Sequence, residues 1–256
     1  MTMGKTIAIT GKGGVGKTTV SALMVKLLVE AKRGPVLAVD ADPNVNLNAA
    51  LGVEVEHTVG DVREEGLDRA AQLPGGMAKT EFLRMRVMQA LVERTGFDLL
   101  AMGRPEGPGC YCFANSILRA CVDQIGKQYA YLVIDCEAGL EHLSRRTAGD
   151  IDLLVILSDP SIRSLDTAKR VLELVGELRT KVGKKVFAFT RVADGMAPEL
   201  LEAVRARGLP EPLVIPEDGE VERLDAAGKP LVDLPSGSRS LEGVRVLLQQ
   251  AGMLAE

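Results

Sequence analysis

The chain has little aromatic material and contains no tryptophan. Only 3% of its 256 residues are aromatic, so a base-stacking platform for single-stranded nucleic acid has few side chains to build on. Lys and Arg number 31 against 35 Asp and Glu, which gives a net charge of −4. This balance lacks the basic excess that marks nucleic-acid binders. We therefore expect no nucleic-acid partner.

Long hydrophobic runs are also missing. No apolar run reaches the roughly 18 residues of a membrane span, and residues 1–10 show no apolar core followed by a small-residue cleavage site. The sequence thus predicts a cytoplasmic protein with no membrane partner. In that compartment cysteines are expected to be free thiols or metal ligands rather than disulfides. The four cysteines are Cys110, Cys112, Cys121 and Cys136.

Short apolar runs alternate with longer helical patterns along the chain. Strands are predicted at 6–10, 36–40, 98–102, 131–135, 153–157, 185–190 and 213–215. Helices are predicted at 18–32, 79–95, 113–125, 165–181, 198–207 and 240–250. Several strands are apolar throughout, which is typical of parallel strands buried on both faces. The pattern predicts one α/β domain over residues 1–256, with a mostly parallel sheet of seven to eight strands and helices on both faces.

The segment GKGGVGKTT at 11–19 matches G-x-x-x-x-G-K-[ST] between a predicted strand and a predicted helix. Its glycines allow backbone amides to converge on phosphate oxygens, and the helix N-terminus adds its dipole. Lys17 would reach the β- and γ-phosphates, and the Thr18 hydroxyl would bind Mg²⁺. The expected nucleotide contacts are Gly11, Lys12, Gly13, Gly14, Val15, Gly16, Lys17, Thr18 and Thr19.

A second lysine, Lys12, follows the first glycine of the motif. This segment resembles the deviant Walker A sequence KGGxGK[ST] of the P-loop ATPases that include MinD, ParA and the nitrogenase iron protein. The resemblance implies a P-loop fold, ATP hydrolysis to ADP, and a dimer closed around two ATP molecules. It also implies that Lys12 acts on the partner's nucleotide, as an arginine finger does. A solvated surface lysine is the alternative.

The same resemblance assigns two switch segments. VDADPN at 39–44 corresponds to switch I, in which Asp42 would position the attacking water and Asp40 would support the Mg²⁺ shell. YLVIDCEAGLEHL at 131–143 corresponds to a Walker B strand and switch II. There Asp135 would hold Mg²⁺ and the Gly139 amide would sense the γ-phosphate. Lys12, Lys17 and Asp42 are thus the expected catalytic residues. Turn formation by Asp-Pro-Asn is the alternative for the first segment.

The base pocket carries a weaker signal. TRVAD at 190–194 stands where the class has an Asn-Lys/Arg sequence, and Thr190 replaces the Asn. VIPEDGEV at 214–221 matches the second base loop of the class. The expected contacts are Thr190, Arg191, Pro216, Glu217 and Asp218. TRVAD also resembles the T-K-x-D guanine motif with one extra residue, so ATP is favoured and GTP is left open.

A C-x-C pair precedes the predicted helix at 113–125. Cys110 and Cys112 supply only half of a tetrahedral thiolate shell, and a symmetric dimer would bring two such pairs to one axis. Thiols near a helix N-terminus have a lowered pKa, and the thiolate is the metal ligand. Cys121 and Cys136 are expected in the core. His57 and His142 are expected at the surface or in packing.

Five segments together resemble the nickel-insertion accessory ATPases of the CooC and AcsF types. They are GKGGVGKTT, DADPN, the CYC segment, EAGLEHLSRRTA at 137–148 and SDPSIRSLDTAKRV at 158–171. The resemblance implies a homodimer bridged by ATP and by one Ni²⁺ or Zn²⁺. Its clients would be carbon monoxide dehydrogenase or acetyl-CoA synthase.

Two other functions stay open. One is a spatial regulator like MinD or ParA, whose membrane or DNA contact needs a basic face that the predicted helix at 240–250, with Arg245 as its only basic residue, lacks. For that helix we expect core packing. The other is an iron–sulfur reductase component like the nitrogenase iron protein. That family places its second cluster cysteine several residues past the Walker B aspartate, whereas Cys136 follows Asp135 directly.

Overall fold

The protein forms one eight-stranded sheet with helices on both faces. The computed structural model describes residues 4–62, 79–104, 120, 124–137, 150–177, 181–193 and 195–255. The strand order is β3-β4-β2-β5-β1-β6-β7-β8. Every neighbouring pair is parallel except β3 and β4. This confirms the predicted mostly parallel α/β sheet.

Seven of the eight described strands lie close to their predicted positions, and β3 was not predicted. The eight are β1 (Lys5–Gly11), β2 (Val36–Asp40), β3 (Val92–Glu93), β4 (Phe97–Ala101), β5 (Tyr131–Asp135), β6 (Ile151–Ser158), β7 (Val182–Val192) and β8 (Leu213–Pro216). The helices are α1 (Lys17–Glu30), α2 (Leu47–Leu51), α4 (Lys79–Gln89), α7 (Ile162–Glu177), α8 (Pro198–Ala206), α9 (Gly219–Ala226) and α10 (Arg239–Gln250), with 3-10 turns η2 (Gly126–Gln128) and η3 (Leu231–Asp233).

The predicted helix at 79–95 is correct up to residue 89 and wrong over residues 90–95. Helix α4 ends at Gln89, and the chain then forms β3, which pairs antiparallel with β4. The turn between the two strands contains Gly96 at φ +92°, a conformation that β-branched and bulky residues avoid. The short helices α2 and α9 were not predicted from the sequence. The predicted helix at 113–125 falls almost wholly outside the described residues.

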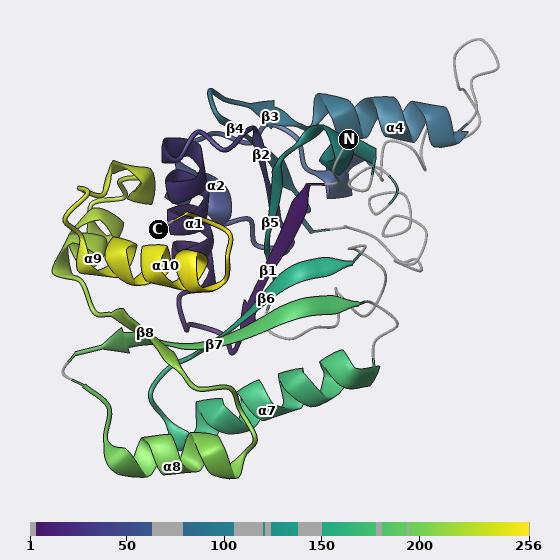
Figure 1. The fold of residues 1–256 in the computed structure, drawn as a ribbon. Helices are drawn as coiled ribbons and strands as arrows, with labels where there is room; N and C mark the ends of the chain where they lie inside the picture. Colours follow the sequence, from purple (N-terminus) through teal and green to yellow (C-terminus); the bar gives the residue numbers. More distant parts are fainter. Residues whose placement is uncertain are drawn as a thin grey trace.

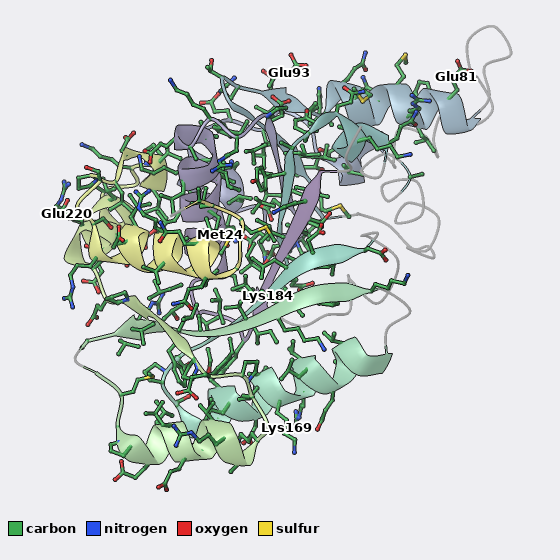
Figure 2. The ribbon with its side chains drawn as sticks, viewed as in Figure 1. Met24, Glu81, Glu93, Lys169, Lys184 and Glu220 are labelled. Carbon is green, nitrogen blue, oxygen red and sulfur yellow. The ribbon has the colours of Figure 1, made fainter. Side chains whose placement is uncertain are left out.

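Two apolar cores cover the two faces of the sheet. On one face α1, α2, α9, η3 and α10 pack together, and on the other lie α4, α7 and α8 (Figure 1). Strand β1 shows the division, because Ile7 and Ile9 face α1 while Ala8 belongs to the opposite core. Figure 2 shows Met24 of α1 inside the layer, whereas Glu93, Lys169 and Glu220 project outward. Burial on both faces explains why these strands read as continuous apolar runs.

The predicted C-terminal amphipathic helix corresponds to α10, and its apolar side is used inside the protein. Leu241, Val244, Leu247 and Leu248 are fully buried in the core that also contains α1. This confirms the expected core packing of the helix. Among the helices that the structure describes, none has the length and hydropathy needed to cross a bilayer.

The sheet order brings the predicted phosphate and switch segments together at the carboxyl ends of neighbouring strands. The strands β2, β5 and β1 are neighbours, with Asp40 opposite Asp135 in the register. The chain leaves β1 toward β2 on one side, whereas β6 lies on the other side of β1. Ligands of open α/β sheets bind beyond the carboxyl ends of strands at such a reversal. Residues 11–19, 39–44 and the end of β5 all meet there.

Candidate functional site

The loop from Gly11 to Gly16 connects β1 to α1. Gly11 has φ +151°, and a Cβ there would lie 2.3 Å from the Leu157 carbonyl oxygen of β6. Gly16 has φ +84° at the N-cap of α1, where no side chain caps the helix. The first turn of α1 therefore keeps its amides available at the carboxyl edge of the sheet. This is the backbone arrangement that binds phosphate oxygens.

Lys17 curls back over this loop. Its side chain is largely buried, and Nζ donates a hydrogen bond to the Lys12 carbonyl oxygen at 3.1 Å. One loop carbonyl thus holds the ammonium beside the amides of the loop. A phosphate group could exchange with that carbonyl as the partner of the ammonium, because charge-assisted contacts are the stronger ones.

Asp135, at the end of β5, is a buried carboxylate that lies close to Thr18, Ser21 and Lys17. It is 1% exposed, and neither carboxylate oxygen accepts a hydrogen bond from the described residues. Burial raises the pKa of Asp135 to about 7, and the charge of Asp40 adds to the rise, whereas Thr18, Ser21 and Lys17 act to lower it. Buried polar atoms are nearly always satisfied, so this carboxylate is suited to a bound cation or to a proton.

The Asp40 carboxylate, at the end of β2, accepts hydrogen bonds from backbone amides of the loop that follows it. Its Oδ1 accepts from the Asp42 amide at 3.0 Å, and its Oδ2 accepts from the amides of Asn46 and Leu47 at 2.9 and 2.8 Å. Burial raises its pKa, and the three amides act against that rise. The carboxylate therefore caps α2 from across the loop. Its expected place in a Mg²⁺ shell stays a prediction.

Asp42 forms a compact turn with Asn44. Its Oδ1 accepts from the backbone amide of Asn44 at 2.9 Å and from Asn44 Nδ2 at 3.0 Å. The next residue, Val45, has φ +49°, which is strained for a β-branched side chain. Strain of this kind clusters at binding and switch segments. Both readings of DADPN, turn and functional loop, are therefore compatible with one geometry.

Two adjoining cavities form one groove beside these residues. A cavity of about 610 Å³ lies against Lys17, Thr18 and Asp42, and one of about 350 Å³ lies against Thr190 and Ile215. Five residues line both: Gly16, Thr19, Arg191, Asp225 and Leu231. The larger cavity sits at the phosphate loop, and the smaller one sits where the base loops were expected. Together they have the size and continuity of a nucleotide site.

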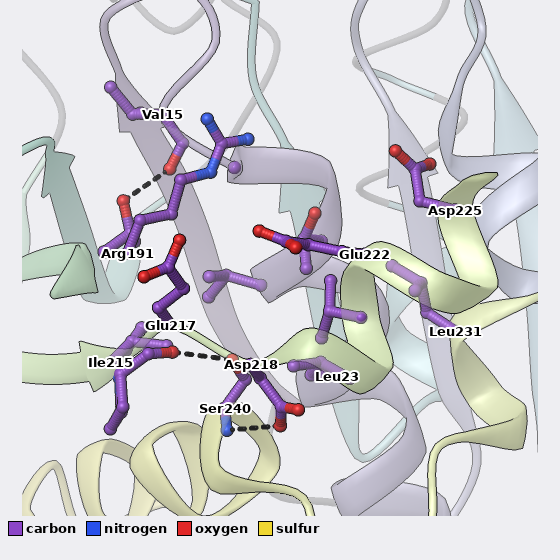
Figure 3. Close-up of a pocket in the computed structure, with 16 residues that line it drawn as sticks. Val15, Leu23, Arg191, Ile215, Glu217, Asp218, Glu222, Asp225, Leu231 and Ser240 are labelled. Carbon is purple, nitrogen blue, oxygen red and sulfur yellow. Dashed lines mark hydrogen bonds between the residues drawn. The ribbon is translucent and has the colours of Figure 1, made fainter. Parts of the chain in front are cut away.

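The smaller cavity is drawn in Figure 3. Arg191 and Glu217 lie on one side of it, and Asp225 and Leu231 lie on the other. Arg191 sits at a bulge in the β7–β8 ladder and has φ +56°, so its side chain leaves the regular alternation of the strand. The expected base contacts Thr190, Arg191, Pro216, Glu217 and Asp218 all line this cavity.

Two of these expected contacts also have internal roles. The Thr190 hydroxyl donates to the Val15 carbonyl oxygen at 2.8 Å and so ties β7 to the phosphate loop. The Asp218 carboxylate accepts from Glu220 N, Ser238 Oγ and Ser240 N at 3.0, 2.6 and 3.0 Å. Burial alone would raise the pKa of Asp218, but these hydrogen bonds outweigh it and lower the pKa. Their contact with a base stays a prediction.

Lys12 lies at the surface. Its side chain is 46% exposed, and Nζ is 4.0 Å from Asp159 Oδ2. An ion pair this long and exposed contributes little to stability. The ammonium is therefore accessible to another molecule, as a role across a dimer interface requires.

The metal prediction rests on residues that the structure does not describe. Cys110, Cys112, Cys121, Gly139 and His142 all fall outside the described ranges. Within those ranges no group of three or more His, Cys, Asp and Glu could hold a metal ion. Cys136 is buried and His57 is exposed, as expected. Burial and the neighbouring Asp135 raise the pKa of the Cys136 thiol.

Sequence reasoning missed several residues at this edge. Asn44 donates a hydrogen bond to Asp42, Arg104 donates one to Asn44, and Lys229 lines the larger cavity. Asn44 lies inside the DADPN segment, so its spacing from Asp42 was available as an Asx-turn signal. Arg104 and Lys229 come from distant parts of the chain, and no local pattern indicates them.

The fold and groove define an α/β P-loop nucleotide-binding protein. A model of the AAA domain family (AAA_31) matches residues 4–187, and the chain belongs to this family of MinD- and ParA-type P-loop ATPases. An uncharacterised ATP-binding protein of Methanocaldococcus jannaschii is 44% identical over 95% of this chain and 97% of its own length. ATP hydrolysis is consistent with the family.

Two further comparisons bear on fold and function. The carbon monoxide dehydrogenase accessory protein CooC of Rhodospirillum rubrum is 33% identical over 91% of each chain. The structure of the septum site-determining protein MinD of Pyrococcus horikoshii, complexed with Mg-ADP, matches with a TM-score of 0.72 at 23% identity. That match covers 99% of this chain and 98% of the other. At this identity it bears on the fold alone.

Proposed function

We propose that this protein is an ATP-dependent metallochaperone of the CooC type. It would deliver nickel during maturation of the metal cluster of carbon monoxide dehydrogenase or acetyl-CoA synthase. The observation that carries the nucleotide part is the buried Asp135 carboxylate beside the phosphate loop, whose oxygens accept no hydrogen bond from the described residues. The similarity to CooC over 91% of both chains supports the choice of client. The C-x-C sequence at 110–112 supports a thiolate metal site.

The residues of the groove fit an ATP–Mg²⁺ complex. Mg²⁺ prefers oxygen ligands and keeps several waters, which suits the Thr18 hydroxyl directly and Asp135 through water. When bound, Mg²⁺ would neutralise charge on the phosphates. The Lys17 ammonium would leave the Lys12 carbonyl and bind the β- and γ-phosphates. The Asp42 carboxylate would orient the attacking water, so that catalysis depends on positioning rather than on a covalent step.

A dimer would complete both sites. The exposed Lys12 ammonium would reach the partner's phosphates and stabilise charge there. Each chain would contribute Cys110 and Cys112, so that two chains form one tetrahedral thiolate site for the Ni²⁺ or Zn²⁺ cargo. ATP binding would order the switch segments, and hydrolysis would release them, changing the distance between the two thiolate pairs.

The metal stoichiometry tests this proposal. We expect one tightly bound Ni²⁺ or Zn²⁺ per two chains, measured by equilibrium dialysis with metal analysis and by light scattering. Cys110→Ser or Cys112→Ser should weaken binding sharply, because only two thiolates would remain across the dimer. Cys136→Ser is the matched control and should retain the metal, since that thiol is buried in the core. Affinity should fall as the pH is lowered, because protons compete for the thiolates.

A different result would identify a different function. One metal per single chain, or full retention after Cys110→Ser, would refute the shared site. The overall fold would also suit a spatial regulator, since it matches that of MinD. The burial of the apolar side of α10 argues against that function, because the helix has no free apolar face for a membrane. ATP-dependent sedimentation with vesicles or DNA would favour the regulator. The burial of Cys136 argues against an iron–sulfur ligand there.

A further inference from the structure

The carboxyl end of β4 lies beside the start of the loop that contains Asp42. Ala101 stands opposite Asp40 in the parallel register of β4 and β2. The ladder continues one residue further, because the Met102 amide donates to the Asp40 carbonyl oxygen at 2.9 Å. The chain that follows β4 is therefore fixed next to the expected catalytic loop.

Close packing fixes the backbone just before Arg104. Gly103 is buried at φ +64°, and a Cβ there would lie 2.3 Å from Thr58 Oγ1. The Gly60 amide donates to the Met102 carbonyl oxygen at 2.8 Å. Thr58 is itself held by Asp61 Oδ2, which accepts from its amide at 2.7 Å and from its hydroxyl at 2.9 Å. The side chain of Arg104 thus extends from an ordered anchor rather than from a free loop.

The guanidinium of Arg104 is connected to Asp42 through Asn44. Arg104 Nη2 donates to Asn44 Oδ1 at 2.6 Å, and Asn44 Nδ2 donates to Asp42 Oδ1 at 3.0 Å. A guanidinium has donors only, so it determines which end of the amide faces it. The opposite end, with its two N–H donors, then faces the carboxylate. Arg104 lines neither cavity of the groove and acts from behind the loop.

The loop between β2 and α2 has a strained backbone and depends on side-chain contacts to keep its conformation. Val45 has a positive φ, and strained residues persist only where their surroundings determine the conformation. On one side the Asp40 carboxylate holds the amides of Asn46 and Leu47. On the other side Arg104 holds Asn44. Loss of Arg104 would remove one of these two supports and leave the helix cap intact.

We propose that Arg104 is a positioning residue for Asp42. Through Asn44 it orients the carboxylate that, under the proposed function, directs water to the γ-phosphate. Arg104→Ala should lower kcat for ATP hydrolysis about tenfold, which corresponds to the loss of one charge-assisted hydrogen bond. The KM for ATP should change less than about twofold, because the residue does not line the groove. Arg104→Lys should recover most of the rate, since an ammonium can also donate to Asn44 Oδ1.

Two further variants separate positioning from general destabilisation. Asn44→Ala should lower kcat as Arg104→Ala does, and the double variant should be no slower than Asn44→Ala alone, because both act through one chain of contacts. Arg94→Ala is the matched control, since that guanidinium donates to the Glu93 carbonyl oxygen at the sheet edge. It should leave kcat unchanged. An unchanged kcat in Arg104→Ala, or additive losses in the double variant, would overturn the proposal.

Hydrogen exchange provides a test that does not depend on activity. In Arg104→Ala the amides of Asn44 and Val45 should exchange at least about fivefold faster than in the wild type, whereas those of Asn46 and Leu47 should keep their protection. Equal exchange at Asn44 in both proteins would also overturn the proposal. If the wild type hydrolyses no ATP, the proposed function fails, while the exchange data still decide the role of Arg104.

Discussion

The two ends of the groove treat their buried carboxylates in opposite ways. At the base end, Asp218 accepts hydrogen bonds from α9, Ser238 and α10, and its pKa is lowered. At the phosphate end, Asp135 accepts none from the described residues, and its pKa is raised to about 7. A satisfied carboxylate rigidifies the wall that contains it, whereas an orphaned one favours any conformation or ligand that supplies a cation. The base end of the groove should therefore keep its conformation, whereas the phosphate end should respond to a bound cation or to protonation.

Removing the carboxylate of Asp42 should have the largest effect on turnover. We expect Asp42→Ala to lower kcat at least about 100-fold while ATP affinity changes little, because the residue would orient water rather than bind phosphate. Turnover assays and equilibrium binding measure the two quantities. Lys17→Ala is the reference variant and should instead lose affinity on the order of 100-fold, since it removes the cation at the phosphates. Near-normal turnover in Asp42→Ala would remove switch I from the catalytic site.

The pH dependence of stability should reveal the orphaned carboxylate. The pKa of Asp135 is higher in the folded protein than the ordinary 3.8, so the folded state binds more protons between about pH 4 and pH 7. The free energy of unfolding without nucleotide should therefore fall as the pH rises through that window. Asp135→Asn should remove most of this slope, with the raised pKa of Asp40 accounting for the rest, and should be more stable at pH 8 by about 4 kcal/mol.

Denaturant unfolding at several pH values, without Mg²⁺, measures this effect. Asp152→Asn is a useful control, because its carboxylate accepts a hydrogen bond from the Thr6 amide at 2.7 Å. That substitution should leave the slope between pH 4 and pH 7 in place. Parallel pH curves for the wild type and Asp135→Asn would show that the carboxylate is not orphaned.

At the base end the sign of the pH effect should reverse. The folded pKa of Asp218 is below 3.8, so its stabilisation is present above that pH and is lost as the pH falls through the folded pKa. Asp218→Asn should destabilise the protein by about 2 kcal/mol at pH 7, with the difference closing in acid. Asp225→Asn, an exposed groove residue, should change stability little. Equal losses in both variants would contradict a special role for Asp218.

The smallest effect should come from Thr190, which joins the two ends. Thr190→Val keeps the shape of the side chain but leaves the Val15 carbonyl oxygen without its donor, which should cost about 1 kcal/mol of stability. Thr190→Ser should retain the bond. Thermal melts of the three proteins measure the difference. If Thr190→Val and Thr190→Ser melt together, the hydroxyl does not hold the phosphate loop.

The sequence predicted the framework of the molecule well, because that framework depends on local patterns. Apolar runs at 36–40 and 131–135 became β2 and β5 without adjustment. The short helix α2 could not be predicted, because the carboxylate that caps it, Asp40, lies seven residues upstream and reaches it only through the folded loop. The two residues of β3 are too few to show a period, so the helical pattern before them was extended too far.

The site residues differ in the same way: those set by local sequence were predicted, and those that depend on long-range contacts were not. The phosphate loop was predicted residue by residue, because strand, glycines, Lys17 and helix follow one another in the chain. The double role of Thr190 was not predicted, because its partner Val15 is 175 residues away. The hydrogen-bonded connection from Arg104 through Asn44 to Asp42 is also long-range, since Arg104 and Asn44 are 60 positions apart. Long-range hydrogen bonds of this kind leave no trace in spacing.

The burial of Cys136 has a practical consequence for thiol chemistry. Alkylating reagents are attacked by thiolates. The Cys136 thiol is only 1% exposed and burial raises its pKa, so it should stay unmodified in the native protein. A maleimide label found on the native protein would therefore lie on a cysteine other than Cys136. Cys136 directly follows β5. The rate at which Cys136 is labelled would therefore measure how often the end of this strand opens, and so the local stability of the site.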